Sequence, residues 1–172
     1  SDVNAIGLSA SDGGLVRARK FQPLVDGKKV DIGLVGEVDE VNPMILESLI
    51  TEGYLPVISP VAADNDGIGY NINADLVAAA IGGALRADTV IFLTDVEGIY
   101  RSWPDKSSII DEISIDELKQ IAPSFTDGMI PKVAAAIKAI DSGAFSVRIT
   151  NGTDLACVLD ALDNQGGTLV TA

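Results

Sequence analysis

The chain has 172 residues, 47% of them hydrophobic, which suffices for one domain with a sizeable core or one domain and part of another. With 12 basic and 25 acidic residues, the net charge of −13 excludes a uniformly basic surface, so no nucleic-acid partner is expected. The absence of histidine and the single cysteine, Cys157, exclude imidazole chemistry, thiolate metal clusters and an internal disulfide. Chemistry is left to Lys, Arg, Asp, Glu, Asn, hydroxyl groups and backbone dipoles.

Apolar runs in the sequence are short. None approaches the roughly 20 residues that span a bilayer, and residues 1–4 lack the basic and apolar regions of a secretory signal. We therefore expect no membrane partner and a cytoplasmic location. The mean hydropathy of +0.31 is carried by Val/Ile/Leu runs and Ala-rich stretches, typical of buried strands with helices packed over them. This pattern predicts an α/β fold.

The N-terminal part is predicted to form strands at 5–9, 15–21 and 29–38, with turns at 11–14 and 26–27. The hairpin contains five of the 12 basic residues: Arg17, Arg19, Lys20, Lys28 and Lys29. Two interpretations stay open. These charges either keep an edge ribbon solvated or attract an anionic ligand.

A helix with clear boundaries follows. Asn42 is its predicted N-cap, Pro43 its first residue and Gly53 its end. Its apolar face at helical spacing consists of Met44, Ile45, Leu49 and Ile50. A buried strand is then predicted at 55–61, and a turn at 64–67.

The second half alternates helices and strands. Helices are predicted at 74–85, from Ser114 to before Pro123, at 130–142 and at 153–162. The strands predicted between and after them are 89–93, 145–150 and 168–170, and an irregular excursion covers 98–113. Gly82–Gly83 falls inside a helix and indicates close packing rather than a phosphate loop.

Two amides and a carboxylate gather around the start of the helix at 74–85. Asn73 caps the helix and Asp75 lies in its first turn, where a carboxylate favours the helix dipole. The alternative is functional: Asn71 and Asn73 bind a small polar substrate while Asp75 holds cationic side chains.

Lys132 stands in an unfavourable place for a cation. Asp127 or Gly128 is predicted to cap its helix, with Pro131 in the first turn, so Lys132 lies near the positive end of the helix dipole. A bound anion such as phosphate removes the conflict. The alternative is a surface lysine that solvent screens.

Asp95 emerges at the C-terminal end of the strand at 89–93, where ligands bind in α/β folds. It either accepts hydrogen bonds from a ribose or caps a turn. Neither the P-loop motif, nor the dinucleotide glycine motif, nor the nucleophile elbow occurs in the sequence.

The motifs at 71–75, 93–100 and 127–132, in this order, resemble the C-terminal part of the amino-acid kinase family. Within it, residues 31–38 and 11–16 are similar to the N-acetylglutamate kinases, and the similarity spans essentially the whole sequence. The resemblance implies phosphoryl transfer from ATP with Mg²⁺ to the side-chain carboxylate of N-acetyl-L-glutamate, a step of arginine biosynthesis.

The resemblance also implies an architecture: a three-layer α/β sandwich with a mostly parallel central sheet and an incomplete N-terminal lobe. Residues 1–73 would form a partial substrate-binding lobe and 74–172 the nucleotide-binding lobe. We also expect a homo-oligomer, because a fragment leaves apolar sheet surface and a strand edge unprotected.

Residue roles follow from the family motifs. Asn71 and Asn73 would contact the substrate, Asp75 would organise the active-site lysines, and Lys132 would neutralise charge on the transferred phosphoryl group. The nucleotide pocket would be lined by Asp95, Gly98, Tyr100, Phe125, Gly128 and Met129. No protein ligand for a metal ion is predicted.

The sequence departs from the family pattern, which begins with a strand and a Lys- and Gly-rich loop and later has a second glycine cluster and a substrate-clamping Arg. None of these is present, so we expect a C-terminal fragment that is inactive alone. Two other interpretations stay open: a kinase for carrier-linked aminoadipate or glutamate, disfavoured by residues 31–38, and a noncatalytic nucleotide-binding module.

Overall fold

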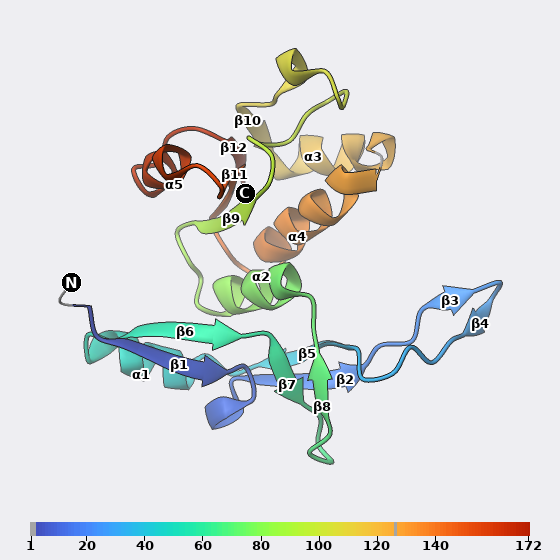
Figure 1. Ribbon diagram of the computed structural model, residues 1–172, viewed down its shortest axis with the longest axis vertical. Coiled ribbons are helices and arrows are strands. Elements are labelled where there is room, and N and C mark those ends of the chain that lie inside the picture. The colour runs from blue at the N-terminus through green and yellow to red at the C-terminus, as the bar shows by residue number, and fades with distance from the viewer. Residues whose placement is uncertain (1–2, 126) are drawn as a thin grey trace. The chain divides into compact units, whose positions relative to one another are not determined.

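The computed structural model describes residues 3–125 and 127–172. The chain divides into two compact units, Ser1–Ala84 and Leu85–Ala172 (Figure 1). The division falls after helix α2 (Ala74–Ala84), because α2 packs on strand β5 (Gly36–Val41) of the first unit. Within the described residues, no helix combines the length and the apolar character that crossing a membrane requires.

The first unit contains a four-stranded mixed sheet in the order β5-β2-β7-β8. Strand β2 (Val16–Lys20) is antiparallel to β5 and parallel to β7 (Val61–Ala63), and β8 (Gly69–Asn71) is antiparallel to β7. Its core side chains are apolar: Leu15, Val16, Ala18, Ala62, Tyr70 and Ile72. The turn before β2 is the 3₁₀ helix η1 (Asp12–Gly14).

A separate two-stranded parallel sheet joins β1 (Ala5–Ser9) to β6 (Leu55–Ser59), and helix α1 (Met44–Thr51) packs on β6. The prediction of a buried strand at 55–61 is wrong in part. Leu55 and Val57 are 53% and 57% exposed, because α1 covers one face of the sheet and alternate side chains project from the other.

The amphipathic prediction for α1 is also corrected. Asn42 does accept a hydrogen bond from the Met44 N–H at 3.2 Å, but Pro43 is the N-cap rather than the first helical residue. In this helix the buried side chain is Leu46, whereas Met44 and Ile50 are exposed.

The predicted hairpin turn at Asp26–Gly27 is confirmed. Both residues have positive φ, 51° and 74°, and they join β3 (Leu24–Val25) to β4 (Lys28–Lys29). The continuous strand predicted at 29–38 is wrong, because β4 ends at Lys29 and the chain turns through Gly33, at φ 84°, before β5 begins.

Acidic neighbours pair with three of the five basic residues of the ribbon, Arg17, Arg19 and Lys20. Arg17 pairs with Asp39 and Glu40, and the Arg19 Nε lies 3.2 Å from Glu37 across the β2–β5 pair. These contacts favour the interpretation of a solvated edge over an anion-binding surface.

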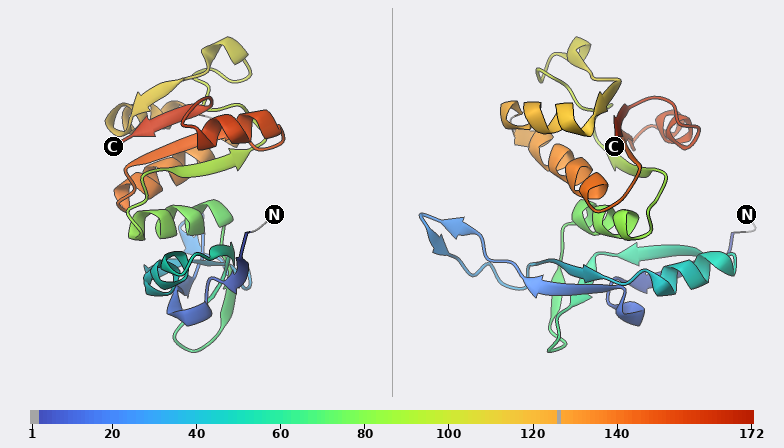
Figure 2. Two further views of the ribbon diagram at one scale, coloured as in Figure 1. Left: turned by 90° about the vertical axis from the view of Figure 1, so that its left-hand side faces the viewer. Right: turned by 180° about the vertical axis from the view of Figure 1, so that it is seen from behind.

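The second unit has three layers (Figures 1 and 2). Its central sheet has the order β10-β12-β11-β9, with β9 parallel to β11, β10 parallel to β12, and β11 antiparallel to β12. Helices α3 and α4 cover one face and α5 covers the other, in agreement with the predicted α/β sandwich. The strands are β9 (Val90–Thr94), β10 (Glu112–Ser114), β11 (Ser146–Asn151) and β12 (Thr168–Thr171).

Local signals set the helix boundaries of this unit. Helix α3 (Ile115–Ile121) begins at Ser114, whose hydroxyl oxygen accepts from the Glu117 N–H at 3.2 Å as the capping box predicted. Helix α5 (Leu155–Leu162) begins later than the predicted Thr153, because Asp154 is its cap. The remaining helices are α4 (Ile130–Asp141) and the 3₁₀ helices η2 (Lys106–Ser108), η3 (Ala122–Ser124) and η4 (Asp127–Met129).

One cation is buried in the sheet of the second unit. Arg148 on β11 is 5% exposed, and its guanidinium donates to the carbonyl oxygens of Asn164, at 2.8 Å, and Gly166. Both acceptors lie in the loop between α5 and β12, so Arg148 fixes the path by which the chain enters the last strand.

Candidate functional site

The amide and carboxylate cluster of the first unit lies where β8 leads into α2. The Asn73 Oδ1 accepts from the Asp75 N–H at 2.9 Å and the Leu76 N–H at 3.2 Å, which confirms the predicted cap. This bonding leaves the Asn73 NH₂ group, a donor, for a ligand. Asn71 ends β8 with an exposed side chain, and Asp75 is half-buried. No described residue of the same unit forms an ion pair with Asp75.

Lys132 lies in the first turn of α4, as predicted, but the cap differs. The N-cap is Met129, not Asp127 or Gly128, because η4 runs directly into the α-helix. Pro131 is in the first turn, where its missing N–H costs no hydrogen bond.

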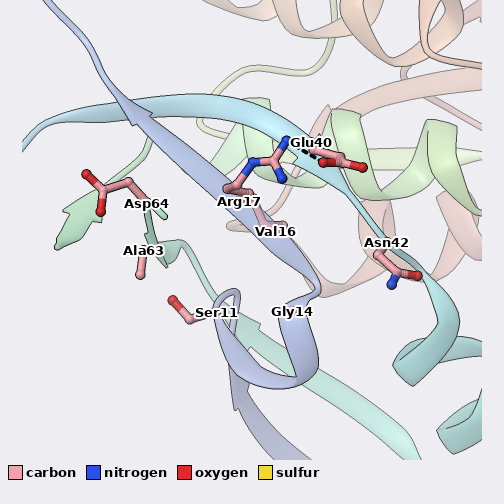
Figure 3. Close-up of a pocket in the computed structure, with 8 residues that line it drawn as sticks. All are labelled: Ser11, Gly14, Val16, Arg17, Glu40, Asn42, Ala63 and Asp64. Atoms are coloured by element: carbon pink, nitrogen blue, oxygen red, sulfur yellow. Dashed lines mark ion pairs between the residues drawn. The ribbon is translucent and has the colours of Figure 1, made fainter. Parts of the chain in front are cut away.

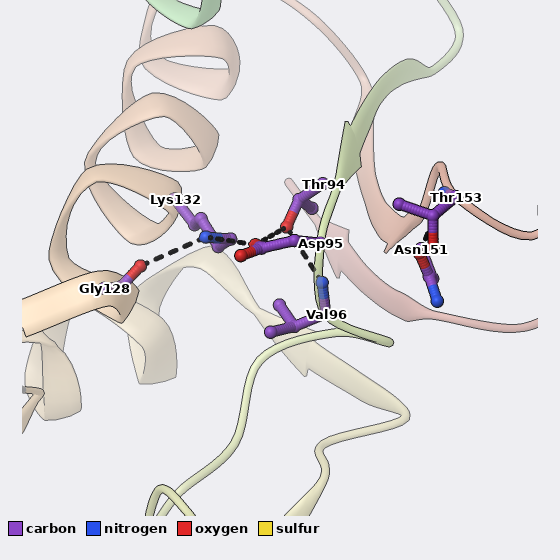
Figure 4. A network of polar contacts seen from close by, with 7 residues as sticks. All are labelled: Thr94, Asp95, Val96, Gly128, Lys132, Asn151 and Thr153. Atoms are coloured by element: carbon purple, nitrogen blue, oxygen red, sulfur yellow. Dashed lines mark hydrogen bonds and ion pairs between the residues drawn. The ribbon is translucent and has the colours of Figure 1, made fainter.

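The charge of Lys132 is compensated by the chain itself (Figure 4). The ammonium Nζ lies 3.4 Å from Asp95 Oδ1 and donates to the Gly128 carbonyl oxygen at 3.2 Å. The Lys132 side chain is 17% exposed and that of Asp95 82%. The carboxylate of Asp95, the residue after β9, therefore takes the place in which the sequence predicted an external anion.

Asp95 is held as a carboxylate by its neighbours. The Thr94 hydroxyl donates to Asp95 Oδ1 at 3.1 Å and accepts from the Val96 N–H at 3.2 Å. The hydrogen bond from Thr94, a backbone N–H and then the Lys132 charge keep the pKa of Asp95 below its usual value. At neutral pH, the exposed end of β9 thus presents one negative charge beside one partly buried positive charge.

A second strand end adds an amide to this region. Asn151 is paired with Thr94 in the parallel β9–β11 register, and its Oδ1 accepts from the Thr153 N–H at 2.9 Å and the Thr153 hydroxyl at 2.7 Å (Figure 4). The sequence indicated only a turn at Asn151. The signal that could have identified Asn151 is its position at the end of a predicted strand in a sheet expected to be mostly parallel.

Two adjoining hollows share Tyr100 and Trp103, and the smaller of them opens beside these strand ends. The smaller, of about 90 Å³, is mainly polar and is lined by Asp95, Val96, Glu97, Tyr100, Trp103, Lys106 and Asn151. The larger, of about 200 Å³, is lined by three aromatic residues, Tyr100, Trp103 and Phe125, together with Arg101, Ser102, Ser124 and Met129. The structure therefore brings together four of the six residues predicted to bind nucleotide: Asp95, Tyr100, Phe125 and Met129.

Trp103, which the sequence indicated only as part of a turn, lines both hollows. Its ring meets the Tyr100 ring edge to face, with centroids 5.2 Å apart and planes at 60°. The Tyr100 hydroxyl donates to Glu97 Oε2 at 3.2 Å, and burial first, then this bond, raises the Tyr100 pKa. The aromatic pair is thus a wall shared by the two hollows, with Tyr100 buried and Trp103 50% exposed.

Gly98 and Gly128, the other two predicted nucleotide residues, line neither hollow. Gly128 instead gives its carbonyl oxygen to Lys132. Gly98 lies against Thr168, so a side chain there would meet β12.

A larger hollow, of about 400 Å³, lies in the first unit (Figure 3). It is lined by Ser11, Gly14, Val16, Arg17, Glu40, Asn42, Ala63 and Asp64. Its one cation, Arg17, is already paired with Asp39 and Glu40. Within the described residues of the chain, no group of three or more acidic or cysteine side chains is arranged to hold a metal ion.

Comparison with known proteins matches residues 1–151 to the amino acid kinase family. The acetylglutamate kinase of Corynebacterium urealyticum is 43% identical over 163 residues, which are 95% of this chain and 54% of that protein. The chain thus spans about half the length of the curated relatives it matches.

Solved structures share the fold. The N-acetylglutamate synthase of Neisseria gonorrhoeae, complexed with coenzyme A and N-acetyl-glutamate, superposes with a TM-score of 0.84 at 22% identity, covering 99% of this chain and 38% of that one. Carbamate kinase of Giardia lamblia bound to AMP-PNP superposes with a TM-score of 0.62 at 26% identity, covering 80% of this chain and 46% of that one. The family match covers most of the chain, and the chain belongs to the amino acid kinase family.

Proposed function

We propose that this chain serves the ATP-dependent phosphorylation of the side-chain carboxylate of N-acetyl-L-glutamate, with MgATP as the donor substrate. The 43% identity to a curated acetylglutamate kinase supports the choice of acceptor. A cytoplasmic location, a homo-oligomeric assembly and a place in arginine biosynthesis belong to the same proposal.

One observation carries the nucleotide part. In the second unit, the hollow that contains the rings of Tyr100, Trp103 and Phe125 adjoins the polar hollow at the strand ends, whose Asp95 pairs with Lys132 at the start of α4. Aromatic faces suit a purine base, polar strand ends suit a ribose, and a helix start with a cation suits phosphate. The AMP-PNP bound to the related carbamate kinase supports a nucleotide as the ligand.

The residues present suit phosphoryl transfer to a carboxylate. The acceptor oxygen attacks the γ-phosphorus and the bond to the β–γ bridging oxygen breaks, so no proton has to be removed from the nucleophile. A site without histidine loses nothing, and catalysis consists of in-line positioning and charge neutralisation. Lys132 supplies positive charge once its ammonium exchanges Asp95 for the phosphoryl oxygens.

Asn71, Asn73 and Asp75 keep their predicted roles in this proposal. The Asn73 NH₂ group and the exposed Asn71 amide bind substrate oxygens, and Asp75 organises cationic groups. Because the cap of α2 already fixes Asn73 Oδ1, the orientation of its donor group is set before substrate arrives.

The test is acyl-phosphate formation by the protein expressed from its complete gene, trapped with hydroxylamine as a hydroxamate. N-acetyl-L-glutamate, L-glutamate, a carrier-linked aminoadipate and carbamate are compared at equal concentration. We expect ATP-dependent product with N-acetyl-L-glutamate above the others. Preference for the carrier-linked substrate would favour the related kinase, and ATP binding without any product would favour a noncatalytic nucleotide-binding module.

A further inference from the structure

The wall of both hollows comes from a short excursion between β9 and β10. Its two arms run antiparallel: the Ile110 N–H donates to the Ile99 carbonyl at 2.8 Å, and the Arg101 N–H donates to the Ser108 carbonyl at 2.9 Å. Tyr100 and Trp103 belong to this excursion. Contacts that hold the two ends of the excursion, at Ile99 and Ile110, therefore also position the aromatic pair.

A single hydroxyl group connects these two ends. The Thr168 Oγ1 accepts from the Ile99 N–H at 2.7 Å and donates to the Ile110 carbonyl at 2.6 Å. One bond goes to each arm, and both cross from β12, about sixty residues later in the chain. Thr168 and Ile99 are fully buried and Ile110 is nearly so, so solvent water does not reach these groups to replace the hydroxyl.

Gly98 lets this contact form. A Cβ added at Gly98 would lie 2.5 Å from Thr168 Oγ1, closer than real Cβ atoms come, and 3.1 Å from the Thr168 backbone nitrogen, which is tighter than most real contacts. The hydroxyl of Thr168 thus reaches both arms only because residue 98 has no side chain. This gives Gly98 a packing task beside the nucleotide role that the family motif implies.

We propose that Thr168 is a positioning residue for nucleotide binding: it holds both arms of the excursion so that Tyr100 and Trp103 keep the two hollows in shape. This inference rests on the proposed function. Without the hydroxyl, a buried N–H and a buried carbonyl lose their partners, and other arrangements of the excursion gain population. The apparent affinity for nucleotide then falls by the fraction of chains that keep the competent arrangement.

The test compares Thr168→Val, which keeps the shape and removes both bonds, with Thr168→Ser, which keeps the hydroxyl. Thr89→Val is the matched control, because it removes a hydroxyl that pairs with Ser146 at the opposite end of β9. ATP affinity is measured by calorimetry and thermal unfolding by circular dichroism. Since Trp103 is the chain's one tryptophan, its emission and near-ultraviolet dichroism follow the excursion without ATP.

We expect Thr168→Val to weaken ATP binding about tenfold and to change the Trp103 signals. Thr168→Ser and Thr89→Val should stay within about twofold of the parent affinity. Gly98→Ala displaces the hydroxyl from the other side and should match Thr168→Val, which keeps the test decisive if one variant folds poorly.

Two failures are distinguishable. A parent chain that binds ATP, together with a Thr168→Val variant that binds equally well, overturns the positioning role and leaves the proposed function intact. A parent chain that binds no ATP overturns the proposed function and this inference with it. A loss of affinity that only tracks the fall in melting temperature, and that Thr89→Val shows equally, also overturns the inference, because it reports stability alone.

Discussion

Asp64 organises the turn between β7 and β8 through its carboxylate. Its Oδ1 accepts from the Ile68 N–H at 2.9 Å and the Asp66 N–H at 3.0 Å, and its Oδ2 accepts from the Tyr70 hydroxyl at 3.1 Å. These bonds, that from Ile68 first, hold the pKa of Asp64 below its usual value. The charged form is therefore the one that the folded first unit favours.

This shift predicts acid sensitivity. Because the folded pKa lies below the unfolded one, the contribution of Asp64 is present above the ordinary value near pH 4 and is lost as the pH falls through the folded pKa. Urea unfolding between pH 7 and pH 2.5 should show stability falling more steeply for the parent than for Asp64→Asn. Asp66→Asn, two residues away, should keep the parent profile. Parallel curves for the parent and Asp64→Asn would refute this role.

The position of Lys132 could be predicted from the sequence, but its ion-pair partner could not. Its position at a helix start could be predicted, because Pro131 and the neighbouring glycine are local signals. Its partner could not, because Asp95 follows a distant strand, β9, and approaches only when α4 packs on the sheet through β11. The Lys132 ammonium does lie near the positive end of the helix dipole, as predicted, and the Asp95 carboxylate compensates its charge. A bound phosphate would have to displace that carboxylate.

Helix α3 offers the clearest test at the scale of an element. The Ser114 hydroxyl satisfies one of the N–H groups that a helix start leaves without an intrahelical partner. Ser114→Ala should lower the free energy of unfolding by about 1 kcal/mol, and Ser114→Asp, which keeps an acceptor, should lose much less. Urea denaturation measures both. An alanine variant as stable as the parent would mean that water satisfies the Glu117 N–H equally well.

Elements fixed by local chemistry were predictable, and those fixed by tertiary contacts were not. The cap at Asn73 depends on a side-chain acceptor, and the turn at Asp26–Gly27 depends on residues that adopt positive φ readily. The sequence shows both residue types directly. The exposure of Leu55 and Val57 depends on which elements cover β6, and the sequence pattern does not state that. Trp103 was missed for the same reason, since its role arises from the packing of the excursion against Phe125 and Met129 around one hollow.

At the scale of the whole molecule, the family was predictable because its motifs occur in the same order along the chain, and the family match confirms it. No single motif carries that assignment. The division into units at Ala84 was not predictable, because it depends on which sheet α2 packs against.

The exposed apolar residues predict self-association. Helix α5 presents Leu155, Leu159 and Leu162, 71%, 54% and 66% exposed, at helical spacing on one face. The net charge of −13 opposes association, so added salt should promote it. Sedimentation equilibrium at tens of micromolar should show a dimer, and Leu155→Gln with Leu159→Gln should weaken it. A monomer at every concentration and salt level would contradict the prediction.

Calorimetric titration of ATP into the 172-residue chain and two lysine variants tests the nucleotide site most directly. Lys132→Ala removes the ammonium beside Asp95, and Lys138→Ala removes an exposed charge from the same helix as the matched control. Losing one charge-assisted contact to phosphate should weaken ATP binding about 10- to 100-fold for Lys132→Ala at low salt, with a smaller difference at high salt. Lys138→Ala should bind like the parent. Equal affinity of the parent and Lys132→Ala, with the fold confirmed by circular dichroism, would show that Lys132 does not meet phosphate.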